Sequence, residues 1–261
     1  MDYLGYFALI GIGLILSLTG AGGSLLSLPI LVYLFSLDVV TASSYSLFIV
    51  GTTSLIGAWL EHQRQRVDIR SGVVFGICSL IAIFATRTWV IPRIPDEILL
   101  SDSVTVTKRV LMLGVFALLA ISSSIIILLK HNWTVNHSAG TRLKFLIPAG
   151  LATGVVVGLA GVGGGFLILP SLLFFARLPF KPAVGTTLLI IGFNSMLGFL
   201  GDVINYPINW LFLLLITGFA IVGMLLGNLY STRIPHQHMR MGFGWIVLTI
   251  AIGMLVTEFL L

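Results

Sequence analysis

Apolar residues along this chain gather into eight long segments separated by short polar stretches. Six of these segments have about the length at which one helix crosses a membrane, roughly 20 residues. The first and the fifth each exceed 30 residues. A continuous helix of that length would measure about 45–50 Å, against a hydrocarbon core of about 30 Å. The segments are 3–35, 41–60, 70–91, 108–129, 145–176, 183–201, 209–230 and 240–260.

A glycine cluster breaks each of the two long segments near its middle. Residues 20–29 read Gly-Ala-Gly-Gly-Ser-Leu-Leu-Ser-Leu-Pro, and residues 161–170 read Gly-Val-Gly-Gly-Gly-Phe-Leu-Ile-Leu-Pro. The difference in number between Gly20 and Gly161, called the repeat offset below, persists without a gap at Gly13/Gly154, Leu18/Leu159, Ala42/Ala183, Gly51/Gly192 and Ser54/Ser195. We therefore predict two four-segment repeats, at 1–130 and 145–261, joined by a cytoplasmic linker at 131–144.

Composition places these repeats in a membrane. The chain is 57% hydrophobic and 9% charged, with a mean hydropathy of +1.11, which excludes a soluble domain. The first apolar stretch lacks a basic flank and runs past signal-peptide length, so we expect it to be retained. The single Cys78 suggests neither a disulfide nor a metal cluster, and the scattered basic residues argue against nucleic-acid binding. We predict an all-α polytopic membrane protein.

Charge discriminates between two interpretations of the long segments, which could be kinked full crossings or re-entrant hairpins. With hairpins, the Lys and Arg residues divide 10 to 4 between the two faces, and with full crossings they divide 6 to 8. Because cytoplasmic loops carry the Lys/Arg excess, the hairpin interpretation is favoured. Each repeat then crosses the membrane three times, so the repeats are inverted and both termini lie outside. The cytoplasmic loops would be 61–70, 130–144, 177–182 and 231–240.

The glycine turns are the candidate binding site. Irregular backbone at membrane depth survives only where protein buries it or where it lines a cavity. Glycine permits positive φ and close approach of a ligand, and the N–H groups of a half-helix starting at the turn favour an anion. Helix packing by small residues is the alternative. The candidate substrate-binding residues are Gly20, Gly22, Gly23, Ser24, Ser54, Gly161, Gly163, Gly164, Gly165, Asn194 and Ser195.

Ionisable residues are missing from the centres of the apolar segments. The acidic residues and histidines fall in loops or at segment ends, and Arg87 near the end of the third segment is expected to snorkel. We therefore expect no catalytic residues, no metal, no cofactor and no enzymatic activity. The expected partners are the lipid bilayer and a small anionic substrate, and nothing in the sequence indicates an oligomer.

The repeated pattern Gly-x-Gly-Gly-x-Leu/Phe-Leu-x-x-Pro, followed by an Ala- and Ser/Thr-rich segment, resembles the TauE/SafE family of sulfite exporters. The triplets Arg93-Ile94-Pro95 and Arg233-Ile234-Pro235 are also similar to that family. The resemblance covers nearly the whole chain and implies an exporter of sulfite, thiosulfate or a small organosulfonate in a bacterial-type inner membrane. A channel or carrier for another small solute is the alternative. Ser24 stands where the second copy has Gly165, so the half-sites are expected to be unequal.

Overall fold

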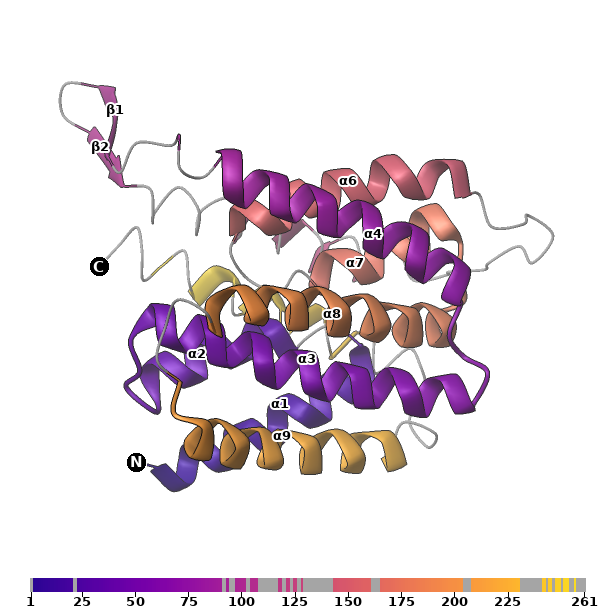
Figure 1. Ribbon diagram of the computed structural model, residues 1–261, viewed down its shortest axis with the longest axis horizontal. Helices are drawn as coiled ribbons and strands as arrows, with labels where there is room; N and C mark the ends of the chain where they lie inside the picture. Colours follow the sequence, from indigo (N-terminus) through magenta and orange to yellow (C-terminus); the bar gives the residue numbers. More distant parts are fainter. Residues whose placement is uncertain are drawn as a thin grey trace.

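The computed structural model is a bundle of helices with one short hairpin of strands (Figure 1). Most of the predicted segment four, 108–129, and about half of segment eight, 240–260, lie outside the residues that the structure describes. The described residues are 2–20, 23–90, 93, 97–101, 104–107, 117–118, 121–122, 124–125, 128, 143–160, 165–203, 208–230, 241–242, 244–245, 247–249, 251–253 and 256.

The helices follow the predicted apolar segments closely. In the first half they are α1 (Asp2–Thr19), α2 (Gly23–Tyr33), α3 (Val39–Gln63) and α4 (Ile69–Ala85), which continues as the π-helix η1 (Thr86–Val90). In the second half they are α6 (Leu143–Ala160), α7 (Gly165–Ser171), the π-helix η3 (Leu172–Ala176), α8 (Phe180–Val203) and α9 (Trp210–Tyr230). The predicted breaks in segments one and five are confirmed, because α1 ends just before Gly20 and α6 ends just before Gly161.

Several of these helices have the length and composition of membrane spans. Among the described residues, 41–63, 180–203 and 210–230 are long and apolar enough to cross a membrane. Large apolar side chains such as Phe7, Phe84, Leu211 and Leu229 are exposed on the outer faces of the helices, as expected for a surface that contacts lipid. The fold is therefore that of a polytopic helical membrane protein.

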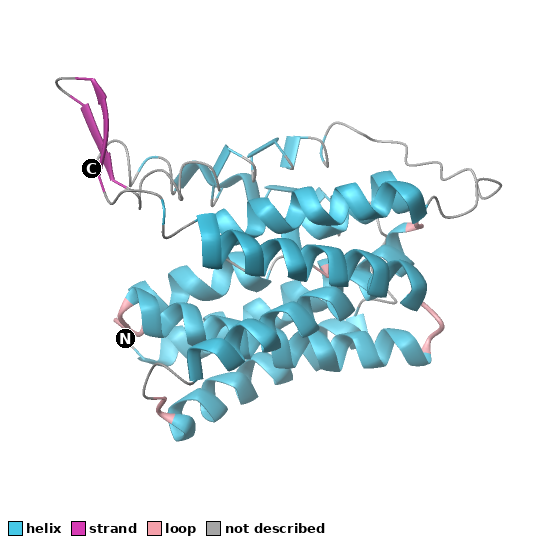
Figure 2. Cartoon of the chain, turned by 45° about the horizontal axis from the view of Figure 1, so that its top comes forward, coloured by secondary structure: helices cyan, strands magenta, loops and turns pink. Residues whose placement is uncertain are grey.

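One short stretch departs from the all-α expectation. Strands β1 (Glu97–Ser101) and β2 (Val104–Thr107) form an antiparallel pair in which Glu97 lies opposite Thr107. Figure 2 shows this hairpin projecting from the helical body. The sequence Val-Thr-Val-Thr in β2 consists of β-branched residues, which favour a strand over a helix.

The bounds of the elements recur with the repeat offset that the sequence shows. Adding this offset to the bounds of α1 gives those of α6, and adding it to α3 gives those of α8 to within one residue. The same shift carries the start of α4 onto the start of α9. Even the loop backbone repeats, because Ser36 and Arg177 both adopt a φ of 52°.

Contacts between the halves recur in the same way. The backbone N–H of Asp68 donates to Thr186 Oγ1 at 2.9 Å. Its counterpart, the N–H of Asn209, donates to Tyr45 Oη, also at 2.9 Å, and Tyr45 is the counterpart of Thr186. Each half therefore donates to the other half the same hydrogen bond that it accepts from it.

The helices are layered around a central pair. Helices α3 and α8 pack against each other at the centre, with α1 beside α9 on one side and α4 beside α6 on the other (Figure 1). Gly51 of α3 lies against Met196, and Gly192 of α8 lies against Leu55. Because the residue numbers of the contact partners rise along α3 as they fall along α8, the two helices are antiparallel.

The chain reverses direction at both helix breaks. The rings of Tyr6, near the start of α1, and Phe35, just after α2, lie 5.4 Å apart between centroids. In the second half, the hydroxyls of Thr153 in α6 and Ser171 at the end of α7 lie 3.2 Å apart. A straight helix would separate residues 18 positions apart by about 27 Å. Each long segment therefore folds back on itself.

Candidate functional site

The first glycine turn begins at Gly20, which has a φ of +70°. Its N–H donates to the carbonyl of Leu16 at 2.7 Å and so closes the last turn of α1. A Cβ at Gly20 would lie 2.8 Å from Cγ1 of Val184 and 3.0 Å from that residue's backbone. The prediction of a glycine with positive φ is confirmed at this position, where any side chain would be both strained and crowded.

Gly23 differs from Gly20 in its backbone conformation. It is the first residue of α2, and the structure gives it no positive φ. A Cβ there would lie 3.0 Å from Cβ of Leu16, so close packing of α2 against α1 is the constraint. Gly165 is buried at the first position of α7. Gly22, Gly161, Gly163, Gly164 and the side chain of Ser24 lie outside the described residues.

The first turn lies near the beginning of α8. Its contact residue Val184 is the fifth residue of that helix, about 6 Å along the axis. The first glycine turn therefore lies close to one end of the bundle and not at half its depth. The reason is the unequal division of the segment, because α1 has 18 residues and measures about 27 Å whereas α2 has 11.

Some hydroxyls of the membrane helices bond to the preceding turn of their own helix. Thr53 Oγ1 donates to the carbonyl of Ile49 at 2.6 Å, and Thr217 Oγ1 donates to that of Leu213, also at 2.6 Å. Such bonds to the preceding turn are the ordinary role of hydroxyls in membrane helices. These residues have no donor to spare for a ligand.

Ser54 and Thr187 are exceptions. Both are 0% exposed, and neither hydroxyl has a hydrogen-bond partner in the part of the chain that the structure describes. Burying a hydroxyl without a partner costs about 1–3 kcal/mol, so a ligand that accepts from it would recover that energy. Thr187 lies one turn along α8 from Val184, on the side of the helix that faces the Gly20 turn.

Sequence reasoning missed Thr187, although a signal was present. Its counterpart at the repeat offset is Ser46, so both repeats carry a hydroxyl at this position. Ser46 is hydrogen-bonded to Ser27 of α2. The counterpart of Ser27 is Ile168, which offers Thr187 no partner.

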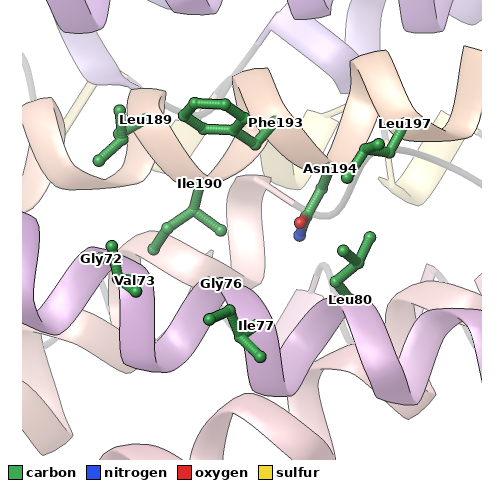
Figure 3. Close-up of a pocket in the computed structure, with 10 residues that line it drawn as sticks. All are labelled: Gly72, Val73, Gly76, Ile77, Leu80, Leu189, Ile190, Phe193, Asn194 and Leu197. Atoms are coloured by element: carbon green, nitrogen blue, oxygen red, sulfur yellow. The ribbon is translucent and has the colours of Figure 1, made fainter.

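Asn194 and Ser195 are placed differently. The Asn194 amide Nδ2 donates to Ser79 Oγ at 3.1 Å and thereby joins α8 to α4. Figure 3 shows this amide at one end of an apolar groove of about 260 Å³ between the two helices. The arrangement supports a packing role for Asn194. Ser195 is buried at 2% exposure on α8.

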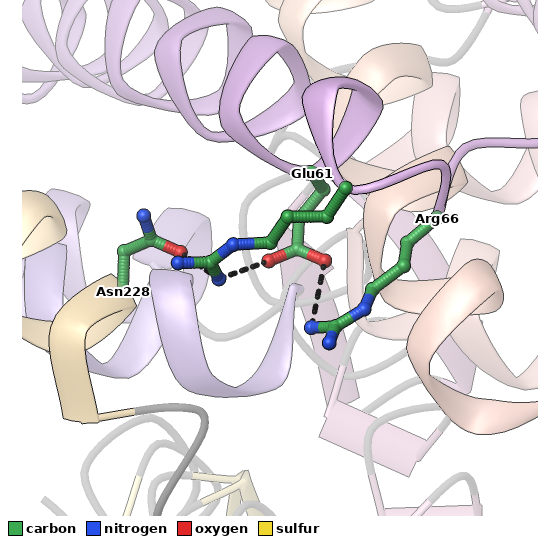
Figure 4. Close-up of polar contacts among 4 residues, drawn as sticks. Glu61, Arg66 and Asn228 are labelled. Atoms are coloured by element: carbon green, nitrogen blue, oxygen red, sulfur yellow. Dashed lines mark hydrogen bonds and ion pairs between the residues drawn. The ribbon is translucent and has the colours of Figure 1, made fainter.

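A charged cluster lies at the end of α3 (Figure 4). Glu61, 8% exposed in the last turn of α3, has Oε1 3.1 Å from Arg64 Nη1 and Oε2 3.6 Å from Arg66 Nη1. Arg64 also donates to Asn228 Oδ1 of α9 at 2.7 Å. The sequence placed Glu61 at a segment end but did not show that two arginines would pair with it.

The same cluster borders a small pocket. Its lining includes Glu61, Arg66, Lys181 and the two α1 residues Ser17 and Leu18. Val184, which touches Gly20, lines it as well. The pocket therefore connects the charged end of α3 with the first glycine turn.

The described geometry is that of a membrane transporter, since helices broken at corresponding positions of two halves are typical of that class. Residues 6–254 match the model of the sulfite exporter TauE/SafE family. The chain belongs to the TauE/SafE family.

Two relatives agree with this class. A probable membrane transporter protein of Xylella fastidiosa strain Temecula1 is 28% identical over 256 residues, which cover 92% of this chain and 90% of the relative. The probable membrane transporter protein YdhB of Bacillus subtilis is 26% identical over 226 residues, covering 86% of this chain and 88% of the relative. No solved structure matches the chain significantly.

Proposed function

We propose that the protein is a secondary transporter that exports a small sulfur-containing anion across a bacterial-type inner membrane. The anion would be sulfite, thiosulfate or an organosulfonate. It would be held at the glycine turns by the N-terminal ends of α2 and of the continuous helical stretch formed by α7 and η3. The membership of the TauE/SafE family supports the substrate class.

The observation that carries this proposal is the reversal of the chain at Gly20. Helix α2 begins three residues later, at Gly23, and the first N–H groups of a helix have no partner within it. These groups and the positive end of the helix dipole favour an anion. The buried hydroxyls of Ser54 and Thr187 add neutral donors.

We further propose that the two repeats, 1–130 and 145–261, are inverted in the membrane and that segments one and five are re-entrant hairpins. The antiparallel packing of the counterparts α3 and α8 supports an inversion, as do the reciprocal contacts of Asp68 and Asn209. Combined with the distribution of Lys and Arg, this proposal would put both termini outside and the loops 61–70 and 177–182 in the cytoplasm.

A binding assay with purified protein tests the substrate class. Binding of [35S]sulfite is measured by scintillation proximity, with thiosulfate, sulfoacetate, sulfate and chloride as competitors. We expect one or more of the first two competitors, but not chloride, to displace the label. Gly20→Val should abolish binding, whereas Gly11→Val should retain it, because a Cβ at Gly11 meets nothing within 4 Å. Absence of specific binding by the wild type, both of [35S]sulfite and of labelled thiosulfate and sulfoacetate in parallel assays, would contradict the proposal.

A further inference from the structure

We propose that Arg64, Arg66 and Lys181 form an anion-capture site in front of the first glycine turn, and that Glu61 occupies the place of the anion while the site is empty. The ligand is a small oxyanion with at least two oxygens. This inference rests on the proposed function and specifies where the transported anion is first bound.

The geometry around Glu61 is that of a bound carboxylate ligand. Its two oxygens are divided between two guanidinium groups, with Oε1 near Arg64 and Oε2 near Arg66. Asn228 holds Arg64 from the other side through its Oδ1. An oxyanion offers the same pair of acceptor oxygens, so it can replace the carboxylate on the same donors.

The charges around the pocket do not balance. Arg64, Arg66 and Lys181 bring three cations to a single carboxylate, that of Glu61. The nearby carboxylate of Asp68, whose oxygens accept from the N–H and the hydroxyl of Ser71 at the start of α4, reduces the surplus to one positive charge. The surplus positive charge attracts an anion, and the partial burial of the cluster limits its screening by salt.

The size of the pocket explains why Glu61 must move. Its volume of about 20 Å³ is enough for about one water molecule and too small for an oxyanion. When the carboxylate leaves the arginines, the space that it held is added to the pocket. The anion then lies beside Ser17, Leu18 and Val184, the residues that border the Gly20 turn.

The sequence does not repeat the residues of the capture site in the other half. At the repeat offset, the counterparts of Arg64, Arg66 and Lys181 are Asn205, Pro207 and Val40. The counterparts of Glu61 and Asn228 are Asp202 and Arg87, one charge of each sign. Asp202 Oδ2 accepts a hydrogen bond from Ser44 at 2.7 Å. An otherwise symmetric fold therefore recruits anions preferentially from the face that carries loops 61–70 and 177–182.

The test is the kinetics of [35S]sulfite transport in inside-out membrane vesicles, which present the cytoplasmic loops to the medium. Arg66→Gln and Lys181→Gln should each raise KM about tenfold with little change in kcat, as expected for the loss of one charge-assisted contact. Glu61→Gln should lower KM severalfold, because it removes the competing carboxylate and keeps the shape. Arg70→Gln is the matched control, since Arg70 is exposed in the same region outside the pocket.

Opposite shifts of KM in Glu61→Gln and Arg66→Gln support the capture site, because loss of a merely structural ion pair would impair both variants alike. An Arg66→Gln KM equal to that of Arg70→Gln overturns the proposal, as does an unchanged or raised KM in Glu61→Gln. If Glu61→Gln fails to insert into the membrane, the KM values of Arg66→Gln and Lys181→Gln relative to that of Arg70→Gln decide the question by themselves. Absence of transport by the wild type of sulfite, and of labelled thiosulfate and sulfoacetate in the same vesicles, would instead refute the proposed function.

Discussion

The packing of α1 against α9 predicts a large effect from the smallest substitution, Gly13→Ala. A Cβ at Gly13 would lie 1.9 Å from the carbonyl oxygen of Ala220 and 2.6 Å from the N of Met224. Both are backbone atoms of α9, so no rotamer change can relieve the overlap. The helices would have to separate by about 1.5 Å to reach an ordinary contact of 3.4 Å.

Overpacking of this kind costs about 1–3 kcal/mol, and the rigid backbone on both sides favours the upper part of that range. Alanine recovers up to about 1 kcal/mol of helix propensity, which leaves a net loss of about 2 kcal/mol. For a chain of this size that loss corresponds to a fall in Tm of roughly 4–8 °C. The assay is thermal unfolding of the detergent-purified protein, followed by tryptophan fluorescence.

Two further variants serve as controls for Gly13→Ala. Gly11→Ala lies on the same helix with nothing within 4 Å of its Cβ, so its Tm should be unchanged or higher. Gly154 is the counterpart of Gly13 in the second half. Gly154→Ala would place its Cβ 2.4 Å from the backbone carbonyl oxygen of Ser79 and should give a smaller fall in Tm. Equal Tm values for Gly13→Ala and Gly11→Ala would refute the close approach of α1 and α9.

Three other predictions follow from the account. Asp68→Ala should lower Tm by roughly 2–4 °C, because it removes the side-chain cap of α4, worth about 1 kcal/mol; an unchanged Tm would contradict the cap. In a Cys78→Ser background, an impermeant maleimide added to intact cells should label Asp2→Cys, which would lie outside, and spare Gln63→Cys, which would lie in the cytoplasm. The reverse pattern would contradict the topology. Sulfite flux at equal pH should follow an imposed potential, worth about 2.3 kcal/mol per charge per 100 mV, and flux that tracks only a pH gradient would indicate proton coupling.

Much of the helical architecture was predictable because it depends on local chain properties. Hydrophobic runs and glycine clusters located the helices and the breaks just before Gly20 and Gly161, and the repeat offset recurs in the bounds of the helices. The β-hairpin was not predicted, since its few alternating residues are too short a pattern to stand out within a membrane protein.

The candidate site was less predictable, because burial and partners depend on residues distant in sequence. Ser54 and Thr53 are adjacent hydroxyl residues, yet only Thr53 is satisfied by its own helix. Asn194 bonds to Ser79, which lies 115 positions away. Glu61 was assigned to a segment end, and only the arrangement of α3, α8 and α9 shows that it is buried beside the glycine turn.

Counterflow in proteoliposomes tests the central claim, transport of a small sulfur-containing anion by a carrier, most directly. Vesicles loaded with unlabelled sulfite are diluted into a trace of [35S]sulfite, with protein-free vesicles and vesicles loaded with sulfate as controls. A carrier exchanges inner for outer substrate, so the account predicts transient accumulation of label in the sulfite-loaded vesicles. Label that only equilibrates, as through a channel, or that fails to enter with sulfite and with labelled thiosulfate and sulfoacetate alike, would contradict the account.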